Sequence, residues 1–210
     1  MAKEEHYYTR FEEGKFYHIY NRTIDKKPMF ATEGNQQFFL NKLQLYLLDV
    51  ADIYAYCLLD NHFHLLIRIK ENLNNFKLAK LTKGIAEMPE THQIVSKQFR
   101  VLFQSYALAF NKQHNRFGTL FQTPFKRALV DDDSYFTQLI YYIHSNPQKH
   151  NLTNDFRHWR WSSYKGIISA KPSRLMKEEV IKWFGNEQEF IKFHTIGKYS
   201  FKDKFIIEDL

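Results

Sequence analysis

Cysteine, glycine and proline are scarce in this chain of 210 residues. Its single cysteine, Cys57, excludes an internal disulfide framework and a zinc site built from cysteines. Because Cys57 stands in an apolar stretch, we expect an inert thiol in the core. The sequence also has no low-complexity segment and no internal repeat of the kind that builds solenoids.

Long apolar runs are absent as well. The most apolar stretch, residues 43–59, is interrupted by Asp49 and Asp52, so we expect no membrane-spanning helix. Residues 1–10 are charged and lack the apolar segment of a secretion signal. Together with the single cysteine, these features predict a reducing, cytoplasmic location.

Aromatic residues and positive charge are abundant. The chain contains 20 Phe and 13 Tyr, and its 30 Lys and Arg outnumber its 23 Asp and Glu, for a formal net charge of +7. A hydrophobic share of 44% with 25% charged residues excludes wholesale disorder. Since cations bind phosphates and aromatic rings stack on bases, the composition suits a nucleic-acid partner. The alternative is that most of the rings belong to the core.

The order of the hydrophobic patterns predicts an α+β fold. We expect strands at 16–21, 53–59 and 62–69, a hairpin of 116–122 and 125–130, and helices capped by Thr32, capped by Ser96 and starting at about Tyr135. Asp60-Asn61 forms the expected turn between two of the strands. Hairpin-linked strands joined by helices favour an antiparallel sheet with helices on one face.

The pattern of hydrophobic and polar residues changes after Asn151. We therefore expect one domain over residues 1–151 and a helical C-terminal extension over residues 152–210, packed on or near that domain. Trp159 and Trp161 lie in a loop-like stretch of the extension. They could stack on unpaired bases, but we favour the interpretation that they pack the extension onto the sheet.

Two histidines stand at the start of an expected strand, in His62-Phe63-His64. Alternation along a strand places His62 and His64 on one face and Phe63 on the other. Two imidazoles on one face make half of a metal site. The alternative is that both are surface or hydrogen-bonded histidines.

A second group of polar residues lies near the end of the last expected helix. Tyr142 and Asn146 are four residues apart and therefore share a helix face, where a phenol could act as a nucleophile and an amide oxygen as a metal ligand. The alternative is that Tyr142 is a core ring and that Asn146 ends the helix before Pro147.

Five segments occur in an order that resembles a known family. They are Tyr17-His18-Ile19-Tyr20-Asn21-Arg22, Asp60-Asn61-His62-Phe63-His64-Leu65-Leu66-Ile67, Gly118-Thr119-Leu120-Phe121-Gln122, Tyr142-Ile143-His144-Ser145-Asn146-Pro147 and Trp161-Ser162-Ser163-Tyr164. Over residues 14–166 the chain resembles the single-tyrosine HUH transposases, in particular the REP-associated tyrosine transposases.

This resemblance implies a ferredoxin-like sheet, and it assigns roles to matching positions. His62 and His64 match the histidine pair that binds Mg²⁺ or Mn²⁺, and Asn146 matches the polar residue that completes the metal site. Tyr142 matches the nucleophile; Tyr141 is turned away by about 100° of helix rotation. The chain departs from relatives after Pro147, where Gln148-Lys149-His150-Asn151 replaces a small basic stretch and a glycine.

The implied activity is metal-dependent cleavage and rejoining of single-stranded DNA, at hairpin-forming sequences, through a 5′-phosphotyrosine. The expected DNA contacts are Arg22, Lys26, Gln122, Lys126, Arg127 and Lys149. One alternative is a module that binds structured DNA or RNA without cutting it. Another is a metallohydrolase that uses the histidines with water, for which we find no acidic ligand at convincing spacing.

Overall fold

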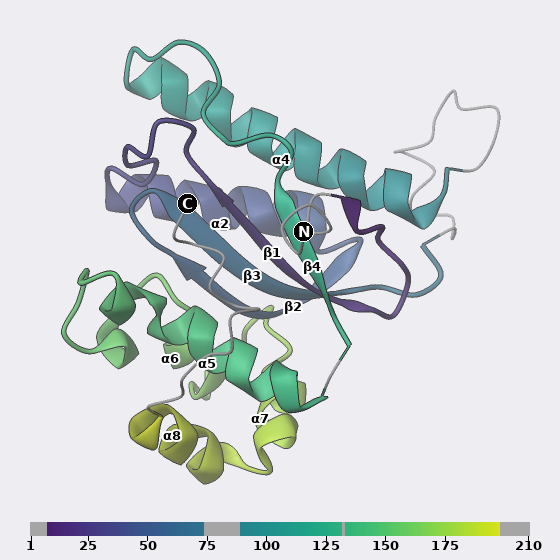
Figure 1. Cartoon of the computed structure of the whole chain (residues 1–210), viewed down its shortest axis with the longest axis vertical. Helices are drawn as coiled ribbons and strands as arrows, with labels where there is room; N and C mark the ends of the chain where they lie inside the picture. Colours follow the sequence, from purple (N-terminus) through teal and green to yellow (C-terminus); the bar gives the residue numbers. More distant parts are fainter. Residues whose placement is uncertain (1–7, 74–88, 132, 198–210) are drawn as a thin grey trace.

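A computed structural model describes residues 8–73, 89–131 and 133–197 of the chain. Its centre is a four-stranded sheet in the order β2-β3-β1-β4 (Figure 1). The strands are β1 (Phe16–Arg22), β2 (Ala51–Leu58), β3 (His62–Ile69) and β4 (Lys126–Val130). The long helices are α2 (Glu33–Leu47), α4 (Thr91–Gln113) and α5 (Asp133–Lys149).

All neighbouring strands pair antiparallel, which fixes the topology. β1 and β2 both pair antiparallel with β3, so they run in the same direction with β3 between them, and α2 connects them. In the same way β3 and β4 flank β1 and are connected through α4. Two interleaved split β-α-β units are the ferredoxin-like arrangement. The predicted α+β class and antiparallel sheet are therefore confirmed.

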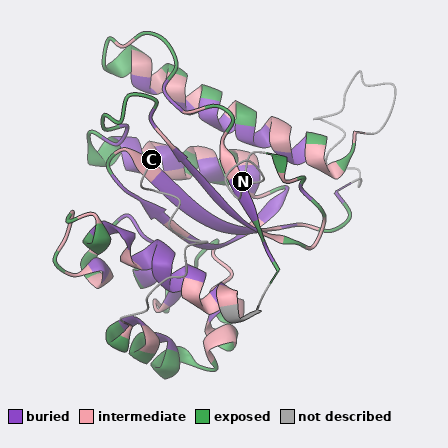
Figure 2. Cartoon of the chain, viewed as in Figure 1, coloured by how far each residue is buried: buried purple, intermediate pink, exposed green. Residues whose placement is uncertain are grey.

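The expectation that the helices cover one face of the sheet is wrong. Figure 1 shows α2 and α4 on one face and α5 on the opposite face. Both crossover helices lie on the same side because such connections are right-handed. The other face is also apolar, since both Leu65 and Leu66 of β3 are buried, and α5 covers it. Figure 2 shows the result, a sheet buried on both faces.

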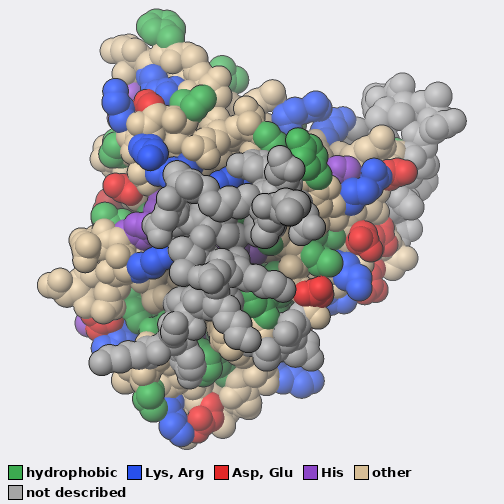
Figure 3. Space-filling model, in the orientation of Figure 1, with side chains coloured by type: hydrophobic (Ala, Val, Ile, Leu, Met, Phe, Trp, Pro, Cys, Tyr) green, Lys and Arg blue, Asp and Glu red, His purple; other side chains and the backbone are tan. Residues whose placement is uncertain are grey.

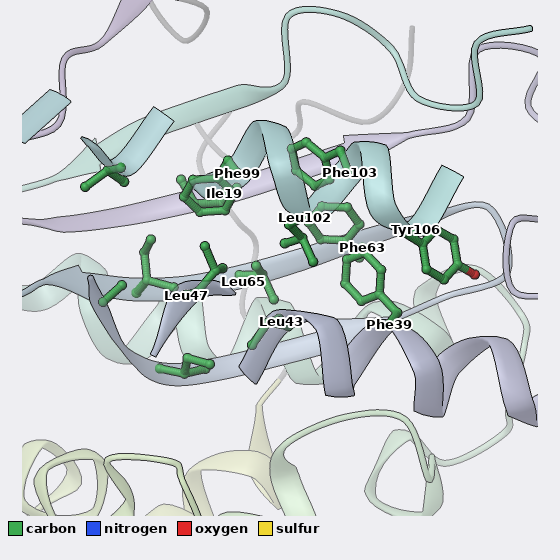
Figure 4. Close-up of a cluster of buried hydrophobic side chains, with 14 of the residues drawn as sticks. Ile19, Phe39, Leu43, Leu47, Phe63, Leu65, Phe99, Leu102, Phe103 and Tyr106 are labelled. Carbon is green, nitrogen blue, oxygen red and sulfur yellow. The ribbon is translucent and has the colours of Figure 1, made fainter. Parts of the chain in front are cut away.

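A core of aromatic and aliphatic side chains joins the sheet to α2 and α4. Ile19, Phe63 and Leu65 project from the strands between the two helices (Figure 4). Phe39 of α2 and Phe103 of α4 contact Phe63, with ring centroids 5.0 and 5.8 Å apart. Because alternate residues of a strand face opposite sides, burying Phe63 in this core turns its neighbours toward α5.

The two crossover helices start differently from each other. Thr32 caps α2 as predicted, with its side chain accepting from Asn35 N–H. In contrast, α4 begins at Thr91 rather than after Ser96. Its first turn is closed by the Gln93 side chain, which accepts from the backbone N–H of Glu90 at 3.0 Å. Such reciprocal capping does not require a hydroxyl at the start of the helix.

The predicted hairpin of 116–122 and 125–130 is half correct. β4 forms and pairs with β1, whereas the preceding segment makes only an isolated bridge between Phe121 and Thr23. Its backbone bonds go to the loop after β1 instead: Ile24 N–H donates to Leu120 O and Gln122 N–H to Arg22 O. Since these bonds satisfy the backbone at the edge of β1, no second strand is needed there.

The C-terminal part packs on α5 and β2. It contains the 3₁₀ turn η2 (Phe156–His158), α6 (Tyr164–Ile167), α7 (Lys177–Phe184) and α8 (Glu187–Ile196). Trp161 is buried in the core, and Trp159 Nε1–H donates to Leu58 O, so both rings attach this part to the sheet as we favoured. The boundary predicted after residue 151 stays a prediction. In the described ranges, no helix is long and apolar enough to cross a membrane.

Candidate active site

The strand alternation places the histidine pair as the sequence predicts. Phe63 is fully buried under α2 and α4, while His62 and His64 face α5. His64 is 1% exposed, and the ring centroids of the two histidines are 5.4 Å apart. The residues on β1 that pair with them, Arg22 and Tyr20, lie on the same face. Two adjacent strands thus build one polar surface beneath α5.

Hydrogen bonds orient both imidazoles through the same ring nitrogen. Nδ1 of His62 lies 2.7 Å from Oδ1 of Asn61, and Nδ1 of His64 lies 2.9 Å from Nε2 of His18. The Nε2 atoms of His62 and His64 are the ring nitrogens that these bonds do not use, and both are buried. Histidine ligands of metals are commonly held in this way, by a bond to the second nitrogen.

His18 belongs to the site although sequence reasoning did not select it. It is 1% exposed, and its ring stacks on His64 with centroids 5.1 Å apart. The signal was present in the alternation of β1, which places His18, Tyr20 and Arg22 on one face. The pairing of β1 with β3 was the missing information.

The last turns of α5 bring a tyrosine to these histidines. The Tyr142 ring meets His64 edge-on at a centroid distance of 5.6 Å and His18 at 6.1 Å. The Nζ atom of Lys149 lies 5.5 Å from the centre of the same ring. Tyr141 faces the other way, packs on Phe193 and donates its hydroxyl hydrogen bond to Gly197 O. The helix therefore separates the two tyrosines as predicted.

Tyr142 and Asn146 of α5 form one stripe with His150, which follows the last residue of the helix and donates its N–H to Asn146 O. At spacings of four residues they share a face. Tyr142 contacts His64 at one end of the stripe, and His150 contacts His62 at the other, with ring centroids 4.9 Å apart. Asn146 lies between them along the helix. His150 was not selected from the sequence, although its spacing from Asn146 was a usable signal.

Asn146 is a buried amide with one unused acceptor. It is fully buried, and its Nδ2–H donates to Tyr142 O at 3.2 Å. Within the described part of the chain, its Oδ1 has no hydrogen-bond partner. A buried acceptor without a partner is costly, so this oxygen is a candidate ligand atom.

The donor set fits a divalent cation. Two imidazole Nε2 atoms and one amide oxygen are suitable ligands for Mn²⁺, and less favourable ones for Mg²⁺, which prefers oxygen. Among residues 8–73, 89–131 and 133–197, no group of three or more His, Cys, Asp or Glu side chains is placed to hold a metal.

A cavity of about 200 Å³ opens beside the histidines. His62, His64 and His150 line it together with three of the six expected DNA-contacting residues, namely Arg22, Gln122 and Lys126. In Figure 3, Lys and Arg side chains lie above and below histidine surface at the left of the view. This volume is below the ~300 Å³ typical of small-molecule pockets, so it suits a phosphodiester group rather than a whole oligonucleotide.

The remaining predicted DNA contacts are placed differently. Lys26 lies on an exposed turn with φ of 60°, whose carbonyl accepts from Asn61 Nδ2–H. Arg127 is not brought to the cavity: it is 8% exposed and packs between Phe11 and Phe125 on the opposite face of β4. The reason is strand alternation, since its neighbour Lys126 faces the cavity.

A neutral histidine pair anchors the far side of α5. Nδ1 of His144 lies 3.0 Å from Nε2 of His194, and Nε2 of His144 lies 2.7 Å from Oγ of Ser163. Burial lowers the pKa of His144 well below its ordinary value, and the neighbouring His194 lowers it further. This network ties α5 to the C-terminal part and so fixes the helix that carries Tyr142.

Comparisons with known proteins find a similar sequence and a similar fold. No protein-family model matches the chain. A Haemophilus influenzae protein assigned as a REP-associated tyrosine transposase is 28% identical over 141 residues, which span 66% of this chain and 69% of that protein. A solved REP-associated tyrosine transposase bound to a REP hairpin shares the fold, with a TM-score of 0.55 at 15% identity, over 79% of this chain and 87% of the other. The chain is therefore similar in sequence to the Haemophilus protein and similar in fold to the solved structure.

Proposed function

We propose that the chain is a transposase-type strand transferase that cleaves single-stranded DNA beside a hairpin, with Tyr142 as the nucleophile and Mn²⁺ or Mg²⁺ as the metal. The observation that carries the proposal is the contact between the Tyr142 ring and His64, one of two histidines oriented through Nδ1. The Haemophilus relative and the solved neighbour, whose DNA is a REP hairpin, support the choice of reaction and substrate.

The phosphate of the substrate enters the cavity between the histidines and the cations. Arg22 and Lys126 bind its charge, and Gln122 offers an amide for hydrogen bonding. His62, His64 and Asn146 would hold the metal, which when bound would polarise the phosphate oxygens. Each of these residues thus stabilises the negative charge that develops during attack.

In the reaction, the Tyr142 oxygen forms a bond to phosphorus, and its proton passes through solvent to the 3′ oxygen that leaves. The bond from phosphorus to the 3′ oxygen breaks, which leaves a 5′-phosphotyrosine and a 3′-hydroxyl. Lys149, above the Tyr142 ring, stabilises the developing phenolate. Because the phosphodiester energy is kept in the covalent bond, another 3′-hydroxyl can reverse the step without a nucleotide cofactor.

Tyr142 is 1% exposed and does not line the cavity. We therefore expect DNA binding and cleavage to be separate steps, with a local rearrangement that exposes the hydroxyl between them. The same observation favours a second candidate, a module that binds structured DNA without cutting it. The two functions make different predictions for a covalent adduct.

A trapping experiment decides between them. The protein is incubated with Mn²⁺ and hairpins carrying single-stranded flanks from its own genome, and adducts are mapped by mass spectrometry. We expect an adduct on Tyr142 that disappears in Tyr142→Phe while hairpin affinity stays within about twofold. Tyr141→Phe, the matched control, should retain the adduct because its ring faces α8. An adduct on Tyr141 would contradict the assignment, and hairpin binding without any adduct would favour the binding module.

A further inference from the structure

The loop after α4 presents an aromatic ring to solvent. Phe117 is 92% exposed, the highest value for any large hydrophobic side chain in the described part of the chain; Tyr8 follows at 75%. A ring that contacts so little adds little to folding stability. Isolated exposed apolar residues are common on proteins, so the construction of the loop is the more informative feature.

The residue before Phe117 anchors the loop. The Arg116 guanidinium donates to Thr119 O at 2.8 Å and to Asn111 Oδ1 at 3.2 Å, and it lies 3.4 Å from Asp25 Oδ2. Asn111 Nδ2–H in turn donates to Gly118 O at 2.9 Å. Arg116 therefore holds α4, its own loop and the loop after β1 together.

The backbone on both sides of this pair is left-handed. Asn115 has φ of 50° and Gly118 has φ of 84°. A Cβ atom at Gly118 would meet nothing within 4 Å, so the backbone conformation, rather than space, calls for glycine there. The two turns direct Arg116 inward and leave Phe117 outside. The backbone that carries the ring is thus held in position before any partner binds, which lowers the entropic cost of binding.

The loop leads directly into the wall of the cavity. Phe121 bridges to Thr23, and Gln122 N–H donates to Arg22 O at 2.9 Å. Gln122 and Arg22 both line the cavity. Gln122 is five positions after Phe117, so their Cα atoms lie at most about 18 Å apart. A few nucleotides of single strand can span that distance.

Exposed lysines lie on the segments that Arg116 joins to the loop. Lys112 in the last turn of α4 is exposed, and so are Lys26 and Lys27 on the loop that Asp25 attaches to Arg116. A protein interface is expected to offer an apolar centre with few charges. An exposed aromatic ring with lysines on the adjoining segments instead matches single-stranded nucleic acid, which is bound by stacking and by phosphate contacts.

We propose that Phe117 is a stacking platform for one unpaired base of the DNA strand whose phosphate occupies the cavity. The inference rests on the proposed function and adds to it a residue that selects single-stranded flanks. Hairpins with a single-stranded flank should therefore bind more tightly than blunt hairpins, and Phe117 should account for the difference.

The test compares two DNA ligands and four proteins at one salt concentration. The ligands are a hairpin with a single-stranded flank and the same hairpin with a blunt end. The proteins are wild type, Phe117→Ala, Phe117→Trp and Leu108→Ala; Leu108 is a matched control on α4, 72% exposed. In a second set, 2-aminopurine replaces each flank base in turn, and its fluorescence reports stacking.

We expect Phe117→Ala to weaken binding of the flanked hairpin by about fivefold or more and to leave the blunt hairpin unchanged. Quenching of 2-aminopurine at one flank position should disappear in Phe117→Ala and persist in Phe117→Trp and Leu108→Ala. If wild type binds the flanked hairpin and Phe117→Ala binds it equally well, only the stacking inference is overturned. If wild type binds neither ligand, the proposed function is overturned with it.

Discussion

Nε2 of His18 lies 2.9 Å from Nδ1 of His64, at a place where both rings are almost fully buried. One of these nitrogens carries the proton and the other accepts it, so the contact couples the tautomers of the two rings. Coordination of a metal by His64 then uses its Nε2. His18 is therefore a positioning residue, which acts on the site through His64.

Removing His18 tests this relationship. His18→Ala should lower Mn²⁺ affinity by about 10- to 100-fold, because an unheld His64 loses its orientation and tautomer. His18→Gln restores a hydrogen-bonding side chain and should recover part of the affinity. Calorimetric titration with Mn²⁺ measures both, and circular dichroism checks that the fold is retained. Unchanged Mn²⁺ affinity in His18→Ala would show that the contact is only structural.

Asn146 should act as a metal ligand and not as a packing residue. Because its Oδ1 is the buried acceptor of the donor set, Asn146→Ala should weaken Mn²⁺ binding by about tenfold and reduce cleavage, with partial recovery at high Mn²⁺. Mn²⁺ should support more cleavage than Mg²⁺, since two imidazoles favour the softer ion. EDTA should abolish cleavage.

The matched control for Asn146→Ala is Ser145→Ala. Ser145 precedes Asn146, and its hydroxyl donates to Tyr142 O. Its loss should leave Mn²⁺ affinity unchanged. Full cleavage by His62→Ala or His64→Ala in EDTA would remove the metal from the mechanism.

The cavity cations should determine how steeply hairpin affinity falls with salt. Each phosphate contact contributes about 0.7 to 0.9 to the slope of log affinity against log salt. Arg22→Ala and Lys126→Ala should each reduce the slope by about that amount. Lys165→Ala, an exposed residue of α6 that does not line the cavity, should not. Equal slopes for Lys126→Ala and wild type would exclude Lys126 from phosphate binding.

Local periodicity was sufficient to predict one part of the site. Alternation predicted that His62 and His64 face away from Phe63, and helix geometry predicted that Tyr141 and Tyr142 diverge. Both statements concern neighbours within one element, where the backbone fixes relative direction. The order of the strands and helices along the chain was also sufficient to predict an antiparallel sheet.

Contacts between residues that are far apart in the sequence could not be predicted from local patterns. His18 meets His64 only because β1 pairs with β3, and His150 meets His62 only because α5 crosses the second face of the sheet. Arg127 was selected for its charge, although the alternation of β4 already separates it from Lys126. Its burial between two Phe rings arises from packing that charge alone does not indicate.

The last prediction concerns acid stability and starts from His194. Its Nε2 lies 3.0 Å from His144 Nδ1, and its Nδ1 lies 2.8 Å from Phe190 O. Burial lowers the pKa of His194 to about 4, from an ordinary value of 6.5, and the bond to Phe190 opposes this shift. The folded state therefore binds fewer protons than the unfolded state between these two values.

Proton linkage determines whether the free energy of unfolding rises or falls with pH. Above pH 6.5 the ring is neutral in both states, so the full stability is present. As the pH falls below 6.5, the unfolded chain takes up a proton that folded His194 does not, and the free energy of unfolding decreases until the pH passes about 4. From the shift to about 4, the loss is roughly 2 kcal/mol by pH 5 and roughly 3 kcal/mol at lower pH. His144 contributes in the same direction, since its pKa is also lowered.

Denaturant unfolding at pH 7.5 and pH 5 measures this loss, and hydrogen exchange shows where it acts. We expect α8 and the facing surface of α5 to lose protection first at pH 5, because the two histidines join them. His194→Gln should be less stable at pH 7.5, by about 1–3 kcal/mol, yet lose less stability on acidification. His158→Gln, a control at an exposed histidine, should behave like wild type. If His194→Gln and wild type lose stability equally between these pH values, His194 is not the group that titrates on unfolding.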